Sequence, residues 1–260
     1  MQWRFCLTTV LGVVLSFSPS VKVQVQAQGL ESLTYYTENY PPLNFAKEDG
    51  KPAGIAVDLL LEAAAAVNVT LNLEQIFVQP WPRSYRSALL KQDGVLFSTT
   101  RTTHRENLFN WVGPIADIKV VVLARKSSQI KVNDPIELGN YRIGVIRDDI
   151  GEQQLLQLGV PRESMVEGST VSSLAEQLLK KRIDLLAYDE RTALWWMSQD
   201  SYPVEEFETV YVLMQGSLYY AFNKNIDKSV LNDLQKGIEL IKNSVNENGV
   251  TRYQAILDKY

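Results

Sequence analysis

Two successive sets of short apolar strands and amphipathic helices constrain the fold of this chain most strongly. Residues 55–67 show the helical pattern clearly, because Val57, Leu60, Leu61 and Ala64 share one face. Chains that alternate strands with helices form mostly parallel sheets with helices on both faces. The first set has predicted strands at residues 33–37, 71–78 and 95–99 and predicted helices at residues 55–67 and 82–92. The sequence therefore predicts an α/β fold.

The second set repeats this order and indicates a second lobe. Its predicted strands are residues 141–146, 165–168 and 185–188, and its predicted helices are residues 151–158, 171–182 and 190–198. Two strands, residues 209–213 and 218–222, and two helices, residues 229–244 and 250–257, complete the chain. Between the sets, Asp117–Arg125 is a strand-like run without Gly or Pro, typical of a stiff connector that bends only at its end. We expect two lobes, each a mostly parallel sheet flanked by helices.

The amino terminus is typical of a secretory signal peptide. Arg4 makes the start basic, residues 5–21 carry no charge, and the small residue Ala27 marks a cleavage position. We therefore predict that residues 1–27 are removed and that the rest of the chain is exported. The alternative is a membrane anchor, which the shortness of the apolar run and its interruption by Gly12 and Pro19 disfavour.

The composition excludes several kinds of chemistry. The only cysteine, Cys6, lies in the predicted signal peptide, so the exported chain has no thiol for a disulfide, a nucleophile or a metal site. A single histidine, His104, cannot build a histidine-based metal site, and we predict no metal and no cofactor. Loss of Arg4 and Lys22 with the signal leaves 24 basic against 30 acidic residues, a net charge of −6. This charge disfavours nucleic acid and anionic lipid as partners.

Arg105 is the strongest candidate for binding an anionic ligand. It follows the predicted strand at residues 95–99 and the hydroxyl-rich segment Ser98-Thr99-Thr100. A guanidinium group can form two parallel hydrogen bonds to a carboxylate. Asp189 follows the predicted strand at residues 185–188, and ligands of open α/β sheets bind at the carboxyl ends of the strands. A cation and an anion that face one cleft would fit a zwitterion, whereas a solvated surface role is the alternative for Arg105.

Several segments of the chain, taken in order, resemble one known family. These segments are Tyr40–Phe45 with Asp49–Leu59, Thr102–Arg105, Arg142–Ile146, Lys181–Asp189 and Leu218–Phe222. They are similar to the sequence signatures of the family 3 bacterial extracellular solute-binding proteins, the amino-acid-binding proteins of ABC importers. The resemblance extends over nearly the whole predicted mature chain.

The resemblance implies a periplasmic-binding-protein-like clamp of two lobes, with the ligand cleft between them. The first lobe would comprise residues 28–117 and 218–260, the second residues 118–217, and the two would close around the solute by a hinge. In this scheme Arg105 binds the α-carboxylate with Thr100 donating beside it, and Asp189 accepts from the α-ammonium group. Tyr40 forms part of an aromatic wall, for which Trp81 is the candidate partner. The expected protein is a periplasmic monomer without catalytic residues that delivers a small amino-acid-like solute to the membrane permease of an ABC importer.

One segment departs from the family pattern. Where the family usually offers Gly and Thr to the ligand carboxylate, residues 147–151 read Arg-Asp-Asp-Ile-Gly. Arg147 is the candidate to replace the lost donors, whereas Asp148 and Asp149 would repel an anion unless they point away or cap the next helix. Arg83 and Arg101 are further cations on the side of the first lobe. They would bind a second acid of the ligand, or they are solvated or form ion pairs between the lobes.

Two other functions are compatible with the same fold. One is an enzyme of the dehydratase kind that acts on a carboxylate substrate, with Asp149 or Glu38 as the acid. The other is a sensory module that signals to a membrane receptor in trans. The sequence contains no Ser-His-Asp triad, Gly-x-Ser-x-Gly elbow or Gly-rich phosphate loop, so a binding protein remains our main prediction.

Overall fold

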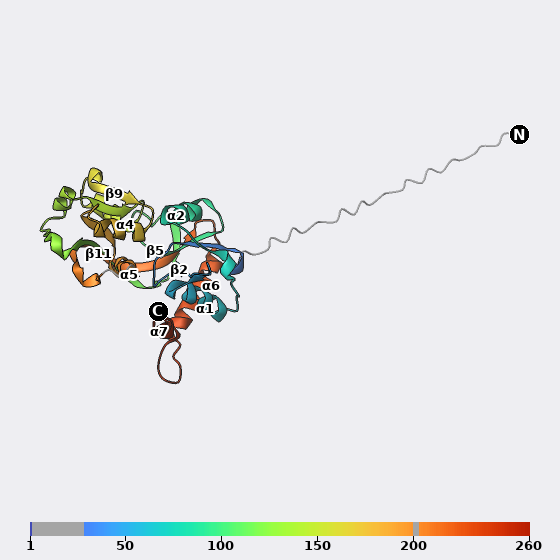
Figure 1. Ribbon diagram of the computed structural model, residues 1–260. Coiled ribbons are helices and arrows are strands. Elements are labelled where there is room, and N and C mark those ends of the chain that lie inside the picture. The colour runs from blue at the N-terminus through green and yellow to red at the C-terminus, as the bar shows by residue number, and fades with distance from the viewer. Residues whose placement is uncertain (2–28, 200–202) are drawn as a thin grey trace.

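The computed structural model describes Met1 and residues 29–199 and 203–260 (Figure 1), and the predicted signal peptide lies outside these residues apart from Met1. Within them, one sheet has the strand order β4-β1-β5-β11-β7-β10-β8-β9, and β6 also pairs with β11. The strands are β1 (Thr34–Thr37), β4 (Ile76–Val78), β5 (Gly94–Thr100), β6 (Phe109–Val112), β7 (Asp117–Arg125), β8 (Ile143–Ile146), β9 (Met165–Gly168), β10 (Leu185–Asp189) and β11 (Phe207–Asn223). A small separate hairpin pairs β2 (Phe45–Ala46) with β3 (Pro52–Ala53).

The sheet has a parallel part at each end and an antiparallel part in the middle. Strands β4, β1 and β5 run parallel in the first lobe, and β10, β8 and β9 run parallel in the second. Strands β7 and β11 run antiparallel between them. The helices of the first lobe are α1 (Ile55–Ala66), α2 (Trp81–Leu90), α6 (Lys228–Asn243) and α7 (Arg252–Leu257); those of the second are α3 (Ile150–Gln157), α4 (Val171–Leu179) and α5 (Glu190–Gln199). The predicted α/β fold of two lobes is confirmed.

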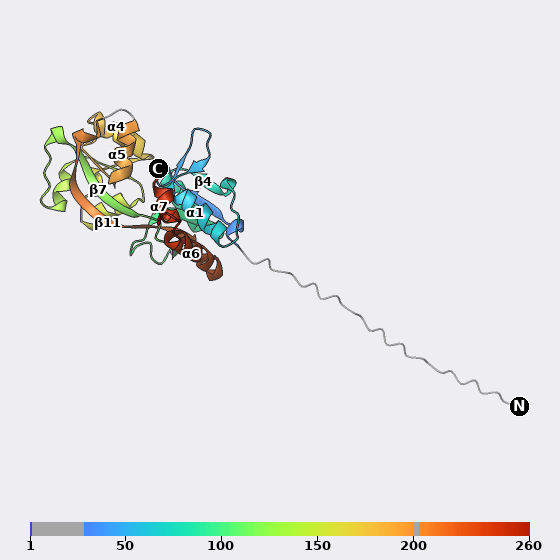
Figure 2. The ribbon, with the colours of Figure 1, turned by 90° about the horizontal axis from the view of Figure 1, so that it is seen from below.

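Strand β11 connects the two lobes as one continuous element (Figure 2). Its first part pairs with β7, and its second part pairs with β5 and β6. The prediction of two separate strands at residues 209–213 and 218–222 was therefore wrong. Gly216 and Ser217, which lie between the two predicted strands, continue the ladder opposite Ile118 and Asp117. The predicted lobe boundaries fall at these paired residues, and they remain a prediction.

A second correction concerns the predicted strand at residues 71–78. Only Ile76–Val78 pairs with β1, because Leu73–Gln75 form a turn of 3₁₀ helix. The Gln75 side chain accepts a hydrogen bond from the backbone N–H of Asn72 at 3.0 Å, which closes this turn. Leu71 and Leu73 pack against the core, although this segment is not a strand. Their alternating apolar side chains explain why the sequence predicted one.

Helix α6 returns the carboxyl-terminal segment to the first lobe and packs against α1. Gly237 of α6 is buried, and a Cβ atom at this position would lie 2.1 Å from the backbone oxygen of Ala63 in α1. The two helix backbones can approach this closely because glycine has no side chain. None of the described helices is long and apolar enough to cross a membrane.

Candidate functional site

A small cavity lies between the two lobes at the carboxyl ends of their parallel strands. The centre of a water molecule can occupy a volume of about 10 Å³ in this cavity, which is room for one water. An amino acid does not fit into this space, so the walls must separate to admit one. The lining residues come from both lobes and are Glu38, Tyr40, Trp81, Ser98, Thr100, Arg105, Asp149, Ile150, Tyr188, Asp189 and Leu218.

Arg105 is fully buried in this cavity wall. Its Nη2 donates to the backbone oxygen of Asp148 in the second lobe at 2.7 Å, and its Nη1 donates to the backbone oxygen of Thr100 at 3.4 Å. The guanidinium lies over the rings of Trp81 and Tyr85, at 5.0 and 5.5 Å from their centroids. Its Nε has no hydrogen-bond partner among the described residues. Burial lowers the pKa of Arg105, the Asp149 carboxylate opposes this shift, and one donor remains for a ligand acceptor.

Asp189 lies across the cavity at the end of β10 and is 5% exposed. Its carboxylate accepts from the backbone N–H of Thr192 at 3.0 Å and from that of Lys119 at 3.3 Å. Burial raises the pKa of Asp189, and these hydrogen bonds partly counteract the rise. The sequence-predicted pair, Arg105 and Asp189, thus lines one cavity from opposite lobes.

Two further carboxyl groups, Glu38 and Asp149, line the same cavity. Asp149 is buried and caps α3, where it accepts from the backbone N–H of Gly151 at 3.4 Å. Burial raises the pKa of Asp149, and burial together with repulsion from Asp149 raises the pKa of Glu38 well above its usual range. Arg105 lowers both pKa values, and Tyr188 lowers that of Glu38 by a hydrogen bond. Three carboxyl groups therefore line the cavity with Arg105, and the charge of Arg191 also lowers the pKa of Asp189.

Replacing Glu38 with glutamine is expected to raise the melting temperature at neutral pH. The folded protein binds the Glu38 proton more tightly than the unfolded chain does, so the wild type loses stability as pH rises above the ordinary glutamate pKa. Glutamine removes this loss, and each 1 kcal/mol regained corresponds to about 2–4 °C for a chain of this size. Thermal unfolding from pH 4 to 8 measures the effect, which should vanish near pH 4. A constant difference at all pH values would contradict the assignment.

The predicted aromatic residues also line the cavity. Tyr40 packs edge to face against Tyr188 of the second lobe, with ring centroids 5.6 Å apart. Trp81 is buried, and its Nε1 donates to the backbone oxygen of Asp148 at 3.2 Å. Together with Arg105, Trp81 thus holds one carbonyl group of the second lobe against the first. A third contact across the cleft is the hydrogen bond from the Thr192 hydroxyl to the backbone oxygen of Pro41, at 3.0 Å.

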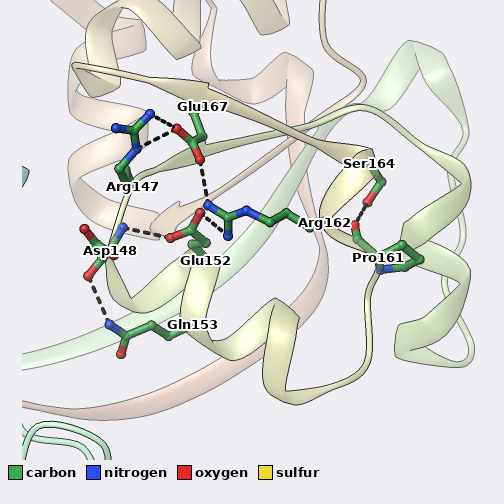
Figure 3. A network of polar contacts seen from close by, with 8 residues as sticks. All are labelled: Arg147, Asp148, Glu152, Gln153, Pro161, Arg162, Ser164 and Glu167. Carbon is green, nitrogen blue, oxygen red and sulfur yellow. Dashed lines mark hydrogen bonds and ion pairs between the residues drawn. The ribbon is translucent and has the colours of Figure 1, made fainter.

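Arg147 lies outside the cavity lining, contrary to its predicted role. Its guanidinium pairs with Glu167, and 62% of its side chain is exposed (Figure 3). Glu167 also pairs with Arg162 at 2.7 Å, and Arg162 pairs with the nearly buried Glu152 at 3.0 Å. Glu152 in turn accepts from the backbone N–H of Asp148 at 2.8 Å. This network holds the Asp148 turn in the second lobe, and the Asp148 carbonyl accepts from Arg105.

The remaining sequence candidates are placed as follows. Thr100 lines the cavity and gives its backbone oxygen to Arg105. Arg101 pairs with Glu106 on the surface at 2.6 Å, and Arg83 is exposed. Sequence reasoning did not assign Ser98 or Tyr188 to the site, and it named Glu38 only as the acid of the alternative enzyme. The signal was present for Glu38, because it directly follows the parallel strand β1, as Asp189 ends β10.

This arrangement defines a class of protein: a two-lobe α/β fold with a polar, charged cavity between the carboxyl ends of two parallel sheets. Residues 33–260 match the family described as bacterial extracellular solute-binding proteins, family 3, and the chain belongs to this family. The resemblance found in the sequence is thus confirmed. The comparison with curated protein sequences gives no match.

Solved structures share the fold at low sequence identity. A histidine kinase sensor domain similar to periplasmic binding proteins has a TM-score of 0.74 at 18% identity, over 88% of this chain and 95% of that one. An ancestral arginine-binding protein bound to arginine has a TM-score of 0.72 at 19% identity, over 88% and 97%. A substrate-binding protein of an ABC uptake transporter from Streptococcus pneumoniae, with bound histidine, has a TM-score of 0.73 at 16% identity, over 87% and 91%. These similarities establish the fold.

Proposed function

We propose that this protein binds an α-amino acid or a related carboxylate in the periplasm and delivers it to an ABC importer. The observation that carries the proposal is the pair Arg105 and Asp189, a cation and an anion on opposite walls of one cavity. The solute carboxylate would take the place of the Asp148 carbonyl on Arg105 and also accept from Arg105 Nε. The α-ammonium group would donate to Asp189. Membership of an extracellular solute-binding family supports the proposal.

Closure of the lobes is the step that converts binding into a signal for a membrane partner. The cavity is too small for a solute, and residues from both lobes line it, so a bound solute must contact both. A solute that binds the closed form better shifts the protein toward closure. Cleavage near Ala27, a periplasmic location, a monomeric state and the lobe boundaries at residues 117 and 217 belong to this proposal.

The first test is a thermal-shift screen of residues 28–260 against amino acids, polyamines, and mono- and dicarboxylates. A solute that binds only the folded protein stabilises it by about 2.7 kcal/mol at a hundredfold excess over Kd. This gain raises the melting temperature by about 5–11 °C at this chain length. We expect such a shift with at least one class of α-amino acid. No shift with any amino acid would overturn the proposed ligand class.

Replacing Asp189 with asparagine is expected to weaken binding of the α-amino acid about tenfold or more. The N–H groups of Thr192 and Lys119 donate to different oxygens of Asp189, so the amide keeps an acceptor for only one of them, and it loses the charge that the ammonium group needs. A hydrogen bond between charged groups contributes about 1.5–3 kcal/mol. Isothermal titration calorimetry should show a much smaller effect on the matching acid without its amino group. Equal losses for both compounds would exclude Asp189 as the ammonium partner.

A receptor-linked sensor is the second candidate function. It is favoured by the structural similarity to a histidine kinase sensor domain, which has the highest TM-score of the three structures compared above. Both functions use the same cleft and the same closure. They differ in the partner, so co-purification with a permease or with a receptor kinase separates them. An enzyme is the remaining alternative, and consumption of a bound carboxylate without a partner would reveal it.

A further inference from the structure

The backbone oxygen of Asp148 accepts hydrogen bonds from three side chains. Arg105 Nη2 donates at 2.7 Å and Trp81 Nε1 at 3.2 Å from the first lobe, and Gln153 Nε2 of α3 donates at 3.0 Å. A peptide carbonyl has two lone pairs, so it satisfies no more than two of these donors well, and it offers no full charge to the Arg105 cation. A carboxylate offers about four acceptor positions and a full charge. The Asp148 carbonyl is therefore a weaker partner for Arg105 than a solute carboxylate.

Asp148 has a backbone conformation that few residues with a side chain adopt. Its φ angle is 59°, in the left-handed region, where the Cβ atom of an L-residue is crowded. Aspartate enters this region more readily than most residues, but negative φ angles remain the commoner ones. A return to a negative φ angle would change the direction of the Asp148 carbonyl. The contact with Arg105 therefore depends on a group that holds the turn in place.

Glu152 of α3 is the group that holds this turn. It is 3% exposed, and its Oε2 accepts from the backbone N–H of Asp148 at 2.8 Å. Arg162 balances the buried carboxylate by pairing with it at 3.0 Å (Figure 3), and a buried carboxylate without such a partner is costly. Neither Glu152 nor Arg162 belongs to the lining of the central cavity. Both residues therefore act on a solute in the cavity through the position of Asp148.

The Asp148 turn has room to move when its carbonyl leaves Arg105. A groove of about 800 Å³ lies beside the turn. Asp148, Glu152 and Arg162 line it from the second lobe, and residues 101–104 line it from the first. The turn can therefore shift toward this groove while a solute occupies the central cavity.

We propose that the Asp148 carbonyl is a built-in substitute for the solute carboxylate and that Glu152 and Arg162 are positioning residues that set how strongly it competes. We call the hydrogen bonds from Arg105 and Trp81 to this carbonyl the Asp148 latch. The latch draws the two lobes together, and a solute carboxylate must displace it from Arg105. This inference rests on the proposed function, because it assumes that the solute carboxylate binds Arg105.

The latch and the bound solute exclude each other, which fixes the sign of the effect. A weaker latch increases the fraction of molecules that can accept a solute, and the apparent Kd falls in proportion. The association rate should rise, whereas the dissociation rate should stay the same because the bound form lacks the latch. A residue that only stabilised the fold of the second lobe would give the opposite result, which is weaker binding.

The test is isothermal titration calorimetry with every standard L-amino acid that raises the melting temperature of the wild type. In Arg162→Gln and Glu152→Ala, we expect a Kd about threefold or more below that of the wild type. Glu152→Gln should lie between, because its amide oxygen still accepts from the Asp148 N–H. The matched control is Arg142→Gln, which should bind as the wild type does. Arg142 is 54% exposed and pairs with Asp184 at 3.0 Å, whereas Arg162 is 52% exposed and pairs with Glu152 at the same distance.

Two further measurements separate the latch from a structural role of Glu152. Stopped-flow tryptophan fluorescence should show faster association and unchanged dissociation in Glu152→Ala. Small-angle X-ray scattering without solute should give this variant a larger radius of gyration than the wild type, and saturation with the amino acid should remove the difference. A thermal melt of each variant confirms that it is folded.

The outcomes distinguish this inference from the proposed function. Unchanged or weaker binding in folded Glu152→Ala and Arg162→Gln overturns the latch and leaves the amino-acid site in place. A radius of gyration equal to that of the wild type without solute also overturns the latch. If no amino acid binds the wild type, the proposed function fails, and the scattering comparison, which needs no solute, still decides whether Glu152 holds the lobes together through Asp148.

Discussion

Replacing Arg105 with alanine should weaken solute binding about 100-fold or more. The guanidinium is fully buried, lies over the rings of Trp81 and Tyr85, and has one donor without a partner among the described residues. Two hydrogen bonds between charged groups contribute about 3–6 kcal/mol in total, which corresponds to a change in Kd of about 100-fold to 10,000-fold. Calorimetric titration with the solute found in the thermal screen measures this change.

Two further variants test whether the loss of affinity is specific to the guanidinium group of Arg105. Arg105→Lys keeps the charge but loses the planar pair of donors, so we expect it to recover only part of the affinity. Arg101→Ala removes an exposed arginine that pairs with Glu106, and it should bind as the wild type does. Circular dichroism establishes whether the alanine variant is folded. Full affinity in a folded Arg105→Ala protein would remove the central element of the proposed site.

Replacing Gly237 with alanine should lower the melting temperature by roughly 3–10 °C. The new methyl group would lie 2.1 Å from the backbone oxygen of Ala63, so α1 and α6 would have to separate. Overpacking of this kind usually costs about 1–3 kcal/mol, which converts to this shift for a chain of this length. Alanine is the better helix former by about 1 kcal/mol, and this gain opposes the clash.

A substitution at the neighbouring residue of α6 serves as the control for Gly237→Ala. Lys236 precedes Gly237 in α6 and is exposed, so Lys236→Ala changes the helix surface without touching α1. We expect its melting temperature to stay close to that of the wild type. If Gly237→Ala were as stable as this control, the close approach of the two helices would not be required for the fold.

The sequence predicted the secondary structure where the physical signal is local. The helix at residues 55–67 was found because its apolar residues repeat with helical spacing, and Asp117–Arg125 was found because the run is apolar and uninterrupted. Strand β11 was predicted as two pieces because its continuity depends on pairing with β7, which is a contact between distant segments. The register shifts near Thr209 and Val212 also disturb the alternation of a regular strand.

The candidate site shows the same division between local and distant signals. The positions of Arg105 and Asp189 follow from the ends of their strands, so their presence at one cavity was predictable. Arg147 also follows a strand, but its partner Glu167 is 20 residues away in the sequence and holds it on the outer surface. The grouping of Glu38 with Asp149 depends on how the two lobes meet, which no local pattern contains.

The size of the central cavity makes affinity a property of the whole molecule. With room for about one water, the site admits a solute only in the fraction of molecules whose walls are apart. The apparent Kd equals the intrinsic Kd divided by the fraction of competent molecules. The contacts of Asp148 and Pro41 with the opposite lobe set this fraction. Thr192 and Pro41 lie outside the cavity lining, so substitutions there are expected to change the apparent Kd without changing a contact of the solute.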